Sequence, residues 1–134
     1  MLSLAKVKQA LEASEKKAAE LGIAVTTVIV DDHGSLIAAS RMDGAIHISP
    51  KFAQTKAYTA ANLGSPTEGL AQYEGDGKPF IYFNTLFGGD LTGIAGGFPV
   101  SLHGKVVGGV GVGGSMDVTQ DAQCAKEAVK VLEA

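Results

Sequence analysis

Apolar side chains near the N-terminus recur every three or four residues, from Val7 to Leu21, while Lys and Glu fill the positions between them. This spacing is typical of an amphipathic helix. Ser3 can cap its first turn, and Gly22 can supply the left-handed residue that follows the last turn. The pattern therefore predicts a helix over residues 3–21.

The next segment changes to a strand pattern. Residues 23–30 are mostly apolar and β-branched, and the turn sequence DDHG separates them from a second extended run at residues 35–41. These features predict a β-hairpin. Further along, LTGIAGGFPVSLHGK predicts a short strand, a tight Gly-Gly-Phe-Pro turn, and a second hairpin whose turn is His103-Gly104.

Two more helices and, between them, one or two helical turns are expected. The sequence ISPKFAQTKAYTAANLG starts with Ser49 as N-cap and Pro50 in the first turn, and its alanines form a small-residue face. SPTEGLAQY carries a capping box from Ser65 to Glu68. The last helix starts with either Asp117 or Thr119 as its cap. The order of elements predicts an α+β domain, with an antiparallel sheet flanked by helices in two or three layers.

Residues 109–114 read GVGVGG, which fits the dinucleotide pattern G-x-G-x-x-G. That pattern needs a following strand in a βαβ unit, and too little chain remains after Gly114 for one. No nucleotide site is therefore expected. The alternation instead predicts a strand with Gly109, Gly111 and Gly113 on one bare face, which can receive a helix, another subunit or a flat ligand. We favour a packed helix.

The length of 134 residues and the lack of a linker predict a single domain over residues 1–134. The net charge of −3, without a run of Lys or Arg, argues against nucleic acid as a partner. No membrane span or signal peptide is expected. The single cysteine, Cys124, cannot form a disulfide within the chain, which suits a reducing, cytoplasmic location. We expect Cys124 to be a small buried residue. Residues 74–90 are interrupted by Gly and Pro, and they suit a lid-like loop or an oligomer contact.

The chain contains three histidines. His33 and His103 lie in predicted turns, and His47 precedes the second helix. Their spacing does not suit a zinc site, so no metal site is expected. A haem iron can be held by a single axial histidine, and each of the three therefore stays a candidate.

Arg41 is the only arginine. It can pair with Asp43 two residues later, or it can bind a carboxylate through its two-pronged guanidinium group, and both alternatives remain open. Lys56 lies on the second helix, where we expect solvent exposure rather than a catalytic role.

Several motifs occur together in order: VIVDDHG, RMDGA, KAYTA, GGFPV, GKVVGGVGVGG and Asp121 in the last helix. This combination resembles the GlcG/HbpS-like family, which includes the C-terminal domain of PduO-type proteins. The resemblance implies a profilin-like α/β/α sandwich with about five antiparallel strands, and assembly into dimers or larger oligomers. Several relatives bind haem, whereas others belong to small-molecule utilisation operons. The family's motif positions in this chain are Asp31, Gly34, Arg41, Met42, Asp43, Lys56, Gly97, Pro99, Gly108, Gly111, Gly113 and Asp121.

Three hypotheses follow. The first is a small-molecule-binding domain for haem or another tetrapyrrole, and its candidate binding residues are His33, His47, Arg41, Lys56, Gly111 and Gly113. The second is an enzyme or accessory factor that acts on a small carboxylate or aldehyde. The third is an oligomeric interaction module without a ligand. We favour binding over catalysis. The expected first helix contains no histidine, so iron ligation through that helix cannot be transferred from relatives.

Overall fold

The computed structural model describes all 134 residues. A four-stranded antiparallel sheet with the strand order β2-β1-β4-β3 lies at its centre. The elements in chain order are α1 (Leu4–Leu21), β1 (Thr26–Asp31), β2 (Leu36–Arg41), α2 (Ser49–Leu63), the 3-10 helices η1 (Thr67–Tyr73) and η2 (Phe83–Gly89), β3 (Gly97–Leu102), β4 (Lys105–Gly113) and α3 (Val118–Glu133).

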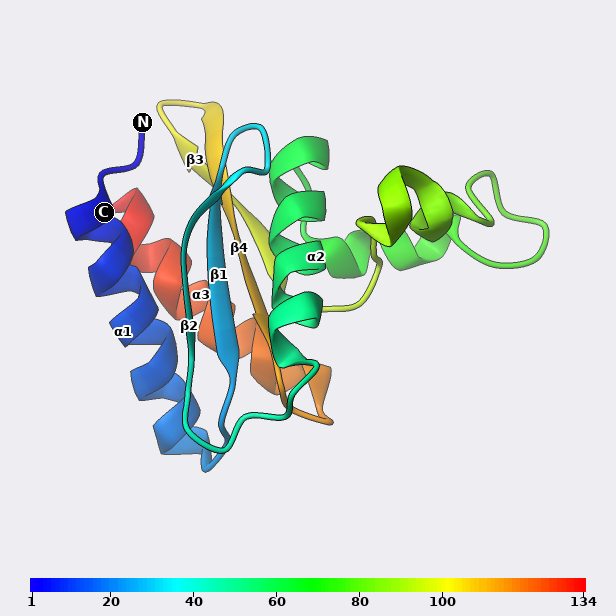
Figure 1. Ribbon diagram of the computed structural model, residues 1–134. Coiled ribbons are helices and arrows are strands. Elements are labelled where there is room, and N and C mark those ends of the chain that lie inside the picture. Colours follow the sequence, from blue (N-terminus) through cyan, green and yellow to red (C-terminus); the bar gives the residue numbers. More distant parts are fainter.

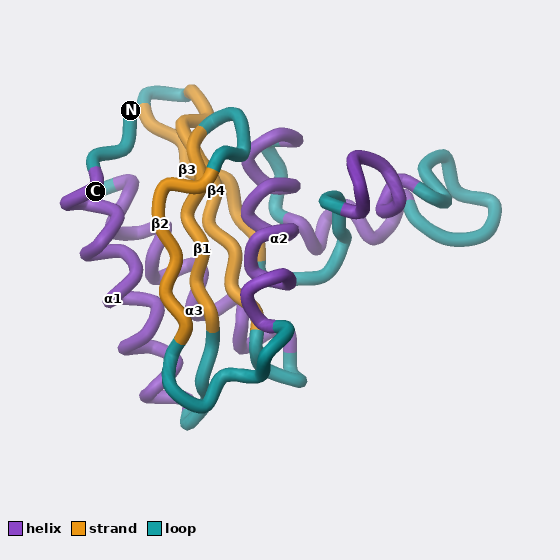
Figure 2. The backbone as a smooth tube through the Cα atoms, viewed as in Figure 1, coloured by secondary structure: helices purple, strands orange, loops and turns teal.

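The helices form two layers on opposite faces of this sheet. Helices α1 and α3 pack side by side on one face, and α2 covers the other (Figures 1 and 2). The α+β class is therefore confirmed. The sheet has four strands, so the expectation of about five is wrong. No helix is both long and apolar enough to cross a membrane.

The Gly-Gly-Phe-Pro segment is not the tight turn that the sequence suggested. Gly97, Phe98 and Pro99 form the start of β3, which lies at the edge of the sheet, and residues 91–96 before it form no strand. An edge strand tolerates proline because one row of its backbone groups needs no partner. Gly97 is required for packing, since a Cβ atom there would lie 2.5 Å from the carbonyl oxygen of Lys56.

The glycines of β4 admit α2. A Cβ atom at Gly109 would lie 2.5 Å from the carbonyl oxygen of Ala57, and one at Gly111 would lie 2.5 Å from the backbone nitrogen of Ala57. The helix backbone therefore rests directly on the strand backbone, and the packed helix favoured from the sequence is confirmed. The valines between these glycines point to the opposite face, where they join the core under α1 and α3.

Most local signals act as expected. The Ser3 side chain accepts a hydrogen bond from the Lys6 N–H, Gly22 is left-handed at φ 72°, and the Asp117 side chain caps α3. Ser49 is an exception, because it is the first residue of α2 and is fully buried. Its hydroxyl donates to the carbonyl oxygen of Ile46 at 2.7 Å and lies 2.8 Å from the Thr26 hydroxyl, so it joins the helix start to β1 instead of capping the helix.

Residues 65–95, hereafter the arm, project from the body beyond α2 (Figure 1). The arm contains η1 and η2, and the proposed capping box is not formed, since Pro66 occupies the N-cap position of η1 without a side-chain bond. Much of its apolar surface is exposed, as shown by Phe80, Tyr82 and Phe87 at 57%, 69% and 68% of full exposure. The arm cannot bury these rings against its own chain in this conformation.

Candidate functional site

The most unusual polar group in the molecule is Lys56, in the middle of α2. The residue is 1% exposed, so the expectation of a solvated lysine is wrong. Its Nζ donates hydrogen bonds to the Val112 carbonyl oxygen at 2.8 Å and to Asp121 Oδ2 at 3.2 Å. A buried charge requires such partners, because transfer of an unpaired ammonium group out of water is very costly.

Asp121 lies in the first turn of α3 and is also 1% exposed. Its second oxygen, Oδ1, accepts a hydrogen bond from the Ser115 backbone N–H at 3.0 Å. The positive end of the α3 dipole further favours an acidic group there. The pair therefore links α2 to α3 past the end of β4, and Gly96 leaves room for it, since a Cβ atom at Gly96 would lie 2.9 Å from Lys56 Nζ.

Burial acts on both members of this pair in the same sense. It lowers the pKa of Lys56 below its usual value and raises the pKa of Asp121, and in each case desolvation outweighs the attraction between the two charges. Desolvation always disfavours the charged form. The environment therefore brings the ionic pair closer in energy to the neutral pair of an amine and a carboxylic acid.

A cavity of about 190 Å³, here called the lysine pocket, opens over this pair. Apart from Lys56 and Asp121, its walls are mainly apolar. They are formed by Ile46, Phe52, Ile94, Gly114, Ser115, Met116 and Val118. Its base thus carries a titratable pair, and its walls suit a small, largely apolar molecule.

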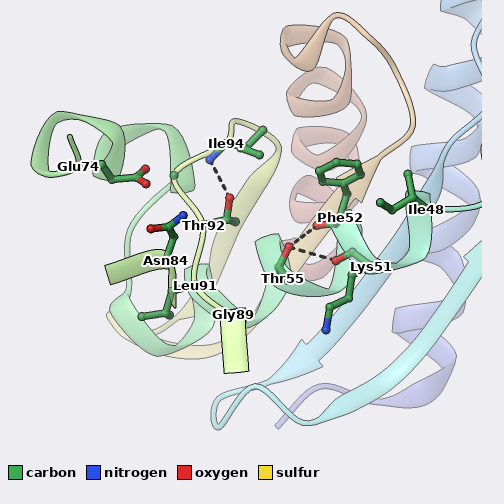
Figure 3. A pocket seen from close by; sticks show the side chains of 11 residues that line it. Ile48, Lys51, Phe52, Thr55, Glu74, Asn84, Gly89, Leu91, Thr92 and Ile94 are labelled. Atoms are coloured by element: carbon green, nitrogen blue, oxygen red, sulfur yellow. Dashed lines mark hydrogen bonds between the residues drawn. The ribbon is translucent and has the colours of Figure 1, made fainter. Parts of the chain in front are cut away.

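A second cavity of about 280 Å³, here called the arm cleft, lies between α2 and the arm. Figure 3 shows Lys51, Phe52 and Thr55 of α2 on one side and arm residues on the other. The Thr55 hydroxyl donates to carbonyl oxygens of its own helix at 3.0 and 3.1 Å (Figure 3). Phe52 and Ile94 line both cavities, so the lysine pocket and the arm cleft share a wall.

His47 lies in the chain between Ile46 and Ile48, each of which lines one of these cavities. Ile46 lines the lysine pocket, Ile48 lines the arm cleft, and all three residues are exposed in the loop before α2. His33 is also exposed, but it lies in the β1–β2 turn, where Asn62 near the C-terminal end of α2 donates to its carbonyl oxygen at 3.3 Å. The 15 residues of α2 span about 22 Å, so the two histidines cannot share a ligand atom.

The remaining predicted residues fall into two groups. Arg41 is exposed and lies opposite Thr26 in the sheet, at the same end of the molecule as His47. It forms none of the salt bridges in the structure, so the proposed pair with Asp43 is absent. Gly111 and Gly113 lie buried beneath α2, and the helix fills the space above them.

Sequence reasoning missed the bond between Lys56 and Asp121. A usable signal was present, because Lys56 lies three residues after Ala53 and four before Ala60, on the small-residue face that packs on the sheet. Both members of the pair are also motif positions of the resemblance. The structure contains no group of three His, Cys, Asp or Glu side chains arranged to hold a metal ion.

Comparison with known proteins agrees with the motifs. A family model described as "Haem degrading protein HbpS-like" matches residues 2–130. The chain belongs to the HbpS-like family. This HbpS-like chain is 35% identical to an uncharacterized 15.0 kDa protein of the dhaT-dhaS intergenic region of Citrobacter freundii, over 96% of this chain and 89% of the relative. It is 35% identical to protein GlcG of Escherichia coli, over 76% of this chain and 73% of GlcG.

Solved structures give the same relationship. Klebsiella pneumoniae protein ORFY superposes with a TM-score of 0.94 at 30% identity, over 98% of this chain and 90% of that one. A structure described as a PduOC:heme complex superposes with a TM-score of 0.92 at 27% identity, over 99% of both chains. The predicted resemblance to the GlcG/HbpS-like family, with its relation to PduO, is therefore confirmed.

Proposed function

We propose that this protein binds haem or a similar planar tetrapyrrole on the surface around His47. The observation that carries the proposal is the position of exposed His47 in the chain between Ile46 and Ile48, which line adjoining cavities. The haem complex of the PduOC relative supports the ligand class.

The residues around His47 fit the three chemical requirements of haem. A single histidine suffices as an axial iron ligand. Exposed apolar side chains can cover a porphyrin face, and Ile46, Ile48 and Ile94 are 46%, 55% and 41% exposed. A cation is needed for the propionates, and the Lys51 ammonium lines the arm cleft with 59% of its side chain exposed.

The protein's part in this function would be to hold and orient the ligand. His47 would bind the iron, and the isoleucines would exclude water from the ring face. Lys51 now forms an exposed contact with Asp90 at 3.4 Å, and such a surface pair contributes little, so its ammonium can turn to a propionate at low cost. The bound iron would supply redox and ligand-exchange chemistry.

Hemin titration tests this proposal. The wild type should show a saturable Soret shift, and His47→Ala should weaken binding at least tenfold and alter the spectrum of the ferric complex. His33→Ala is the matched control, because His33 is also exposed but lies at the other end of α2. No Soret shift in the wild type, or equal behaviour of the two variants, would refute the role of His47.

We also propose self-association through the arm. Its exposed rings at Phe80, Tyr82 and Phe87 form apolar surface of a kind that monomers rarely leave open. A second copy of the chain would cover them. Sedimentation equilibrium tests this directly: the wild type should be a dimer or larger, and Phe80→Ser with Phe87→Ser should shift it to monomer. A monomeric wild type would contradict the proposal.

A further inference from the structure

The base of the lysine pocket carries an amine with unused bonding capacity. An ammonium group has three N–H donors, and the structure assigns Lys56 two acceptors, Val112 and Asp121. The amine lies 6.0 Å from the centre of the Phe52 ring, which also lines the pocket. Lys56 thus lines the pocket with one N–H donor that has no acceptor in the protein.

Asp121 is positioned to accept a proton from this amine. The two groups share a hydrogen bond of 3.2 Å, so one proton can move along it from Nζ to Oδ2. The Ser115 N–H holds the other carboxyl oxygen in place. The neutral amine produced in this way is a nucleophile, and a desolvated lysine in an apolar pocket is a known means of activating one. Burial shifts the pKa values of both groups towards this neutral pair.

We infer that the lysine pocket captures a small aldehyde or ketone as an imine on Lys56, with Asp121 as proton acceptor and donor. The inference does not depend on tetrapyrrole binding. Its ligand class follows from the walls, since Ile94, Met116 and Val118 are apolar and the volume is about 190 Å³. A short aliphatic carbonyl compound satisfies both conditions.

The reaction balances without another reactant. Lys56 gives one proton to Asp121, and the nitrogen lone pair then forms a bond to the carbonyl carbon. A second nitrogen proton moves to the former carbonyl oxygen, which gives the neutral carbinolamine. Asp121 returns its proton to the hydroxyl group, the carbon–oxygen bond breaks, and water leaves. The product is a protonated imine next to an ionised Asp121, so the charges of the original pair are kept.

Trapping the imine in the wild-type protein tests this inference without any variant. The protein is incubated near neutral pH with limiting propionaldehyde and sodium cyanoborohydride, and the alkylated lysines are located by mass spectrometry of chymotryptic peptides. Lys56 should be alkylated at least tenfold faster than Lys51, which lies on the same helix with 59% of its side chain exposed. Labelling of Lys51 with Lys56 unmodified would overturn the inference and would show a purely structural ion pair.

A variant separates the role of Asp121 from that of the pocket. Asp121→Asn keeps the size of the side chain but removes the proton acceptor. Loss of the Asp121 charge lowers the pKa of Lys56 further, but it also removes the group that returns a proton to the leaving hydroxyl. Labelling of Lys56 should therefore slow at least tenfold while labelling of Lys51 stays the same. Equal labelling of Lys56 in the variant and the wild type would overturn the role assigned to Asp121. Since no hemin is present, failure here leaves the test of His47 unaffected.

Discussion

Substitution of Gly111 by alanine gives the sharpest test of how α2 rests on the sheet. A Cβ atom at this position would lie 2.5 Å from the Ala57 backbone nitrogen, and it would also meet the Ala53 carbonyl oxygen. Ordinary carbon contacts begin at about 3.5 Å, so the overlap is about 1 Å. The atoms concerned belong to helix backbone, and no side-chain rotation can relieve the overlap.

The size of the effect follows from this geometry. Overpacking of a core usually lowers the free energy of unfolding by about 1–3 kcal/mol. Because Gly111→Ala would have to displace a whole helix, we expect a loss near the upper end, about 3 kcal/mol. A protein of this size has a free energy of unfolding of about 5–15 kcal/mol, so the variant should fold but lose a large share of its stability. For a domain of intermediate size, the midpoint of thermal unfolding should fall by about 10 °C.

Urea unfolding followed by circular dichroism measures this loss. Gly69→Ala is the matched control, because its Cβ atom would have only an ordinary contact of 3.5 Å with the Ser65 hydroxyl and Gly69 needs no left-handed backbone. The control should stay within about 0.5 kcal/mol of the wild type. Equal stability of the two variants would refute the idea that helix packing requires the bare face of β4.

Three further predictions concern buried polar groups. Lys56→Met should lower the free energy of unfolding by about 3–5 kcal/mol, because it leaves the buried Asp121 unpaired. Adding Asp121→Leu to the same chain should restore most of this stability. If urea unfolding shows that the losses from the two substitutions simply add, the prediction is wrong. Burial raises the pKa of the Cys124 thiol from 9.0 to about 11, so between these pH values only the unfolded chain loses the proton. Stability should therefore fall there as pH rises, and Cys124→Ala should lack this component; identical pH profiles would argue against it. Ser14→Ala should cost about 1–3 kcal/mol, because the Thr27 hydroxyl, 2.7 Å from Ser14 Oγ, loses its buried partner; an unchanged unfolding midpoint would count against that bond.

Features with a local cause were predictable from the sequence. The caps at Ser3 and Asp117 and the turn at His103-Gly104 depend on neighbours within a few residues. The alternation in β4 likewise predicted a bare strand face, because side chains on a strand must alternate. The sequence favoured a packed helix over another subunit or a flat ligand on that face, but only the position of α2 decides between them.

Features that depend on tertiary position were not predictable in the same way. Pro99 suggested a turn, yet a proline fits an edge strand, and strand order decides between the two. Ser49 has the residue type of an N-cap, but the approach of Thr26 turns it into a bridge to β1. Lys56 and Asp121 are 65 residues apart in sequence, and only the meeting of α2 and α3 shows that they form a pair.

The candidate haem ligands His33 and His47 likewise could not be ranked without the tertiary structure. Both looked alike in the sequence, as single residues beside turns or helix starts. The structure places them differently. The exposed neighbours of His47, Ile46 and Ile48, line two apolar-walled cavities, whereas His33 follows the acidic residues Asp31 and Asp32 at the far end of α2. Proximity to apolar surface, which no local motif encodes, makes His47 the better candidate.

A crystal structure of the protein grown with hemin would show directly whether His47 holds the iron of a tetrapyrrole. We expect electron density for a tetrapyrrole over Ile46 and Ile48, with the iron bound to an imidazole nitrogen of His47. Iron bound to any other side chain, with the surface around His47 empty, would contradict it.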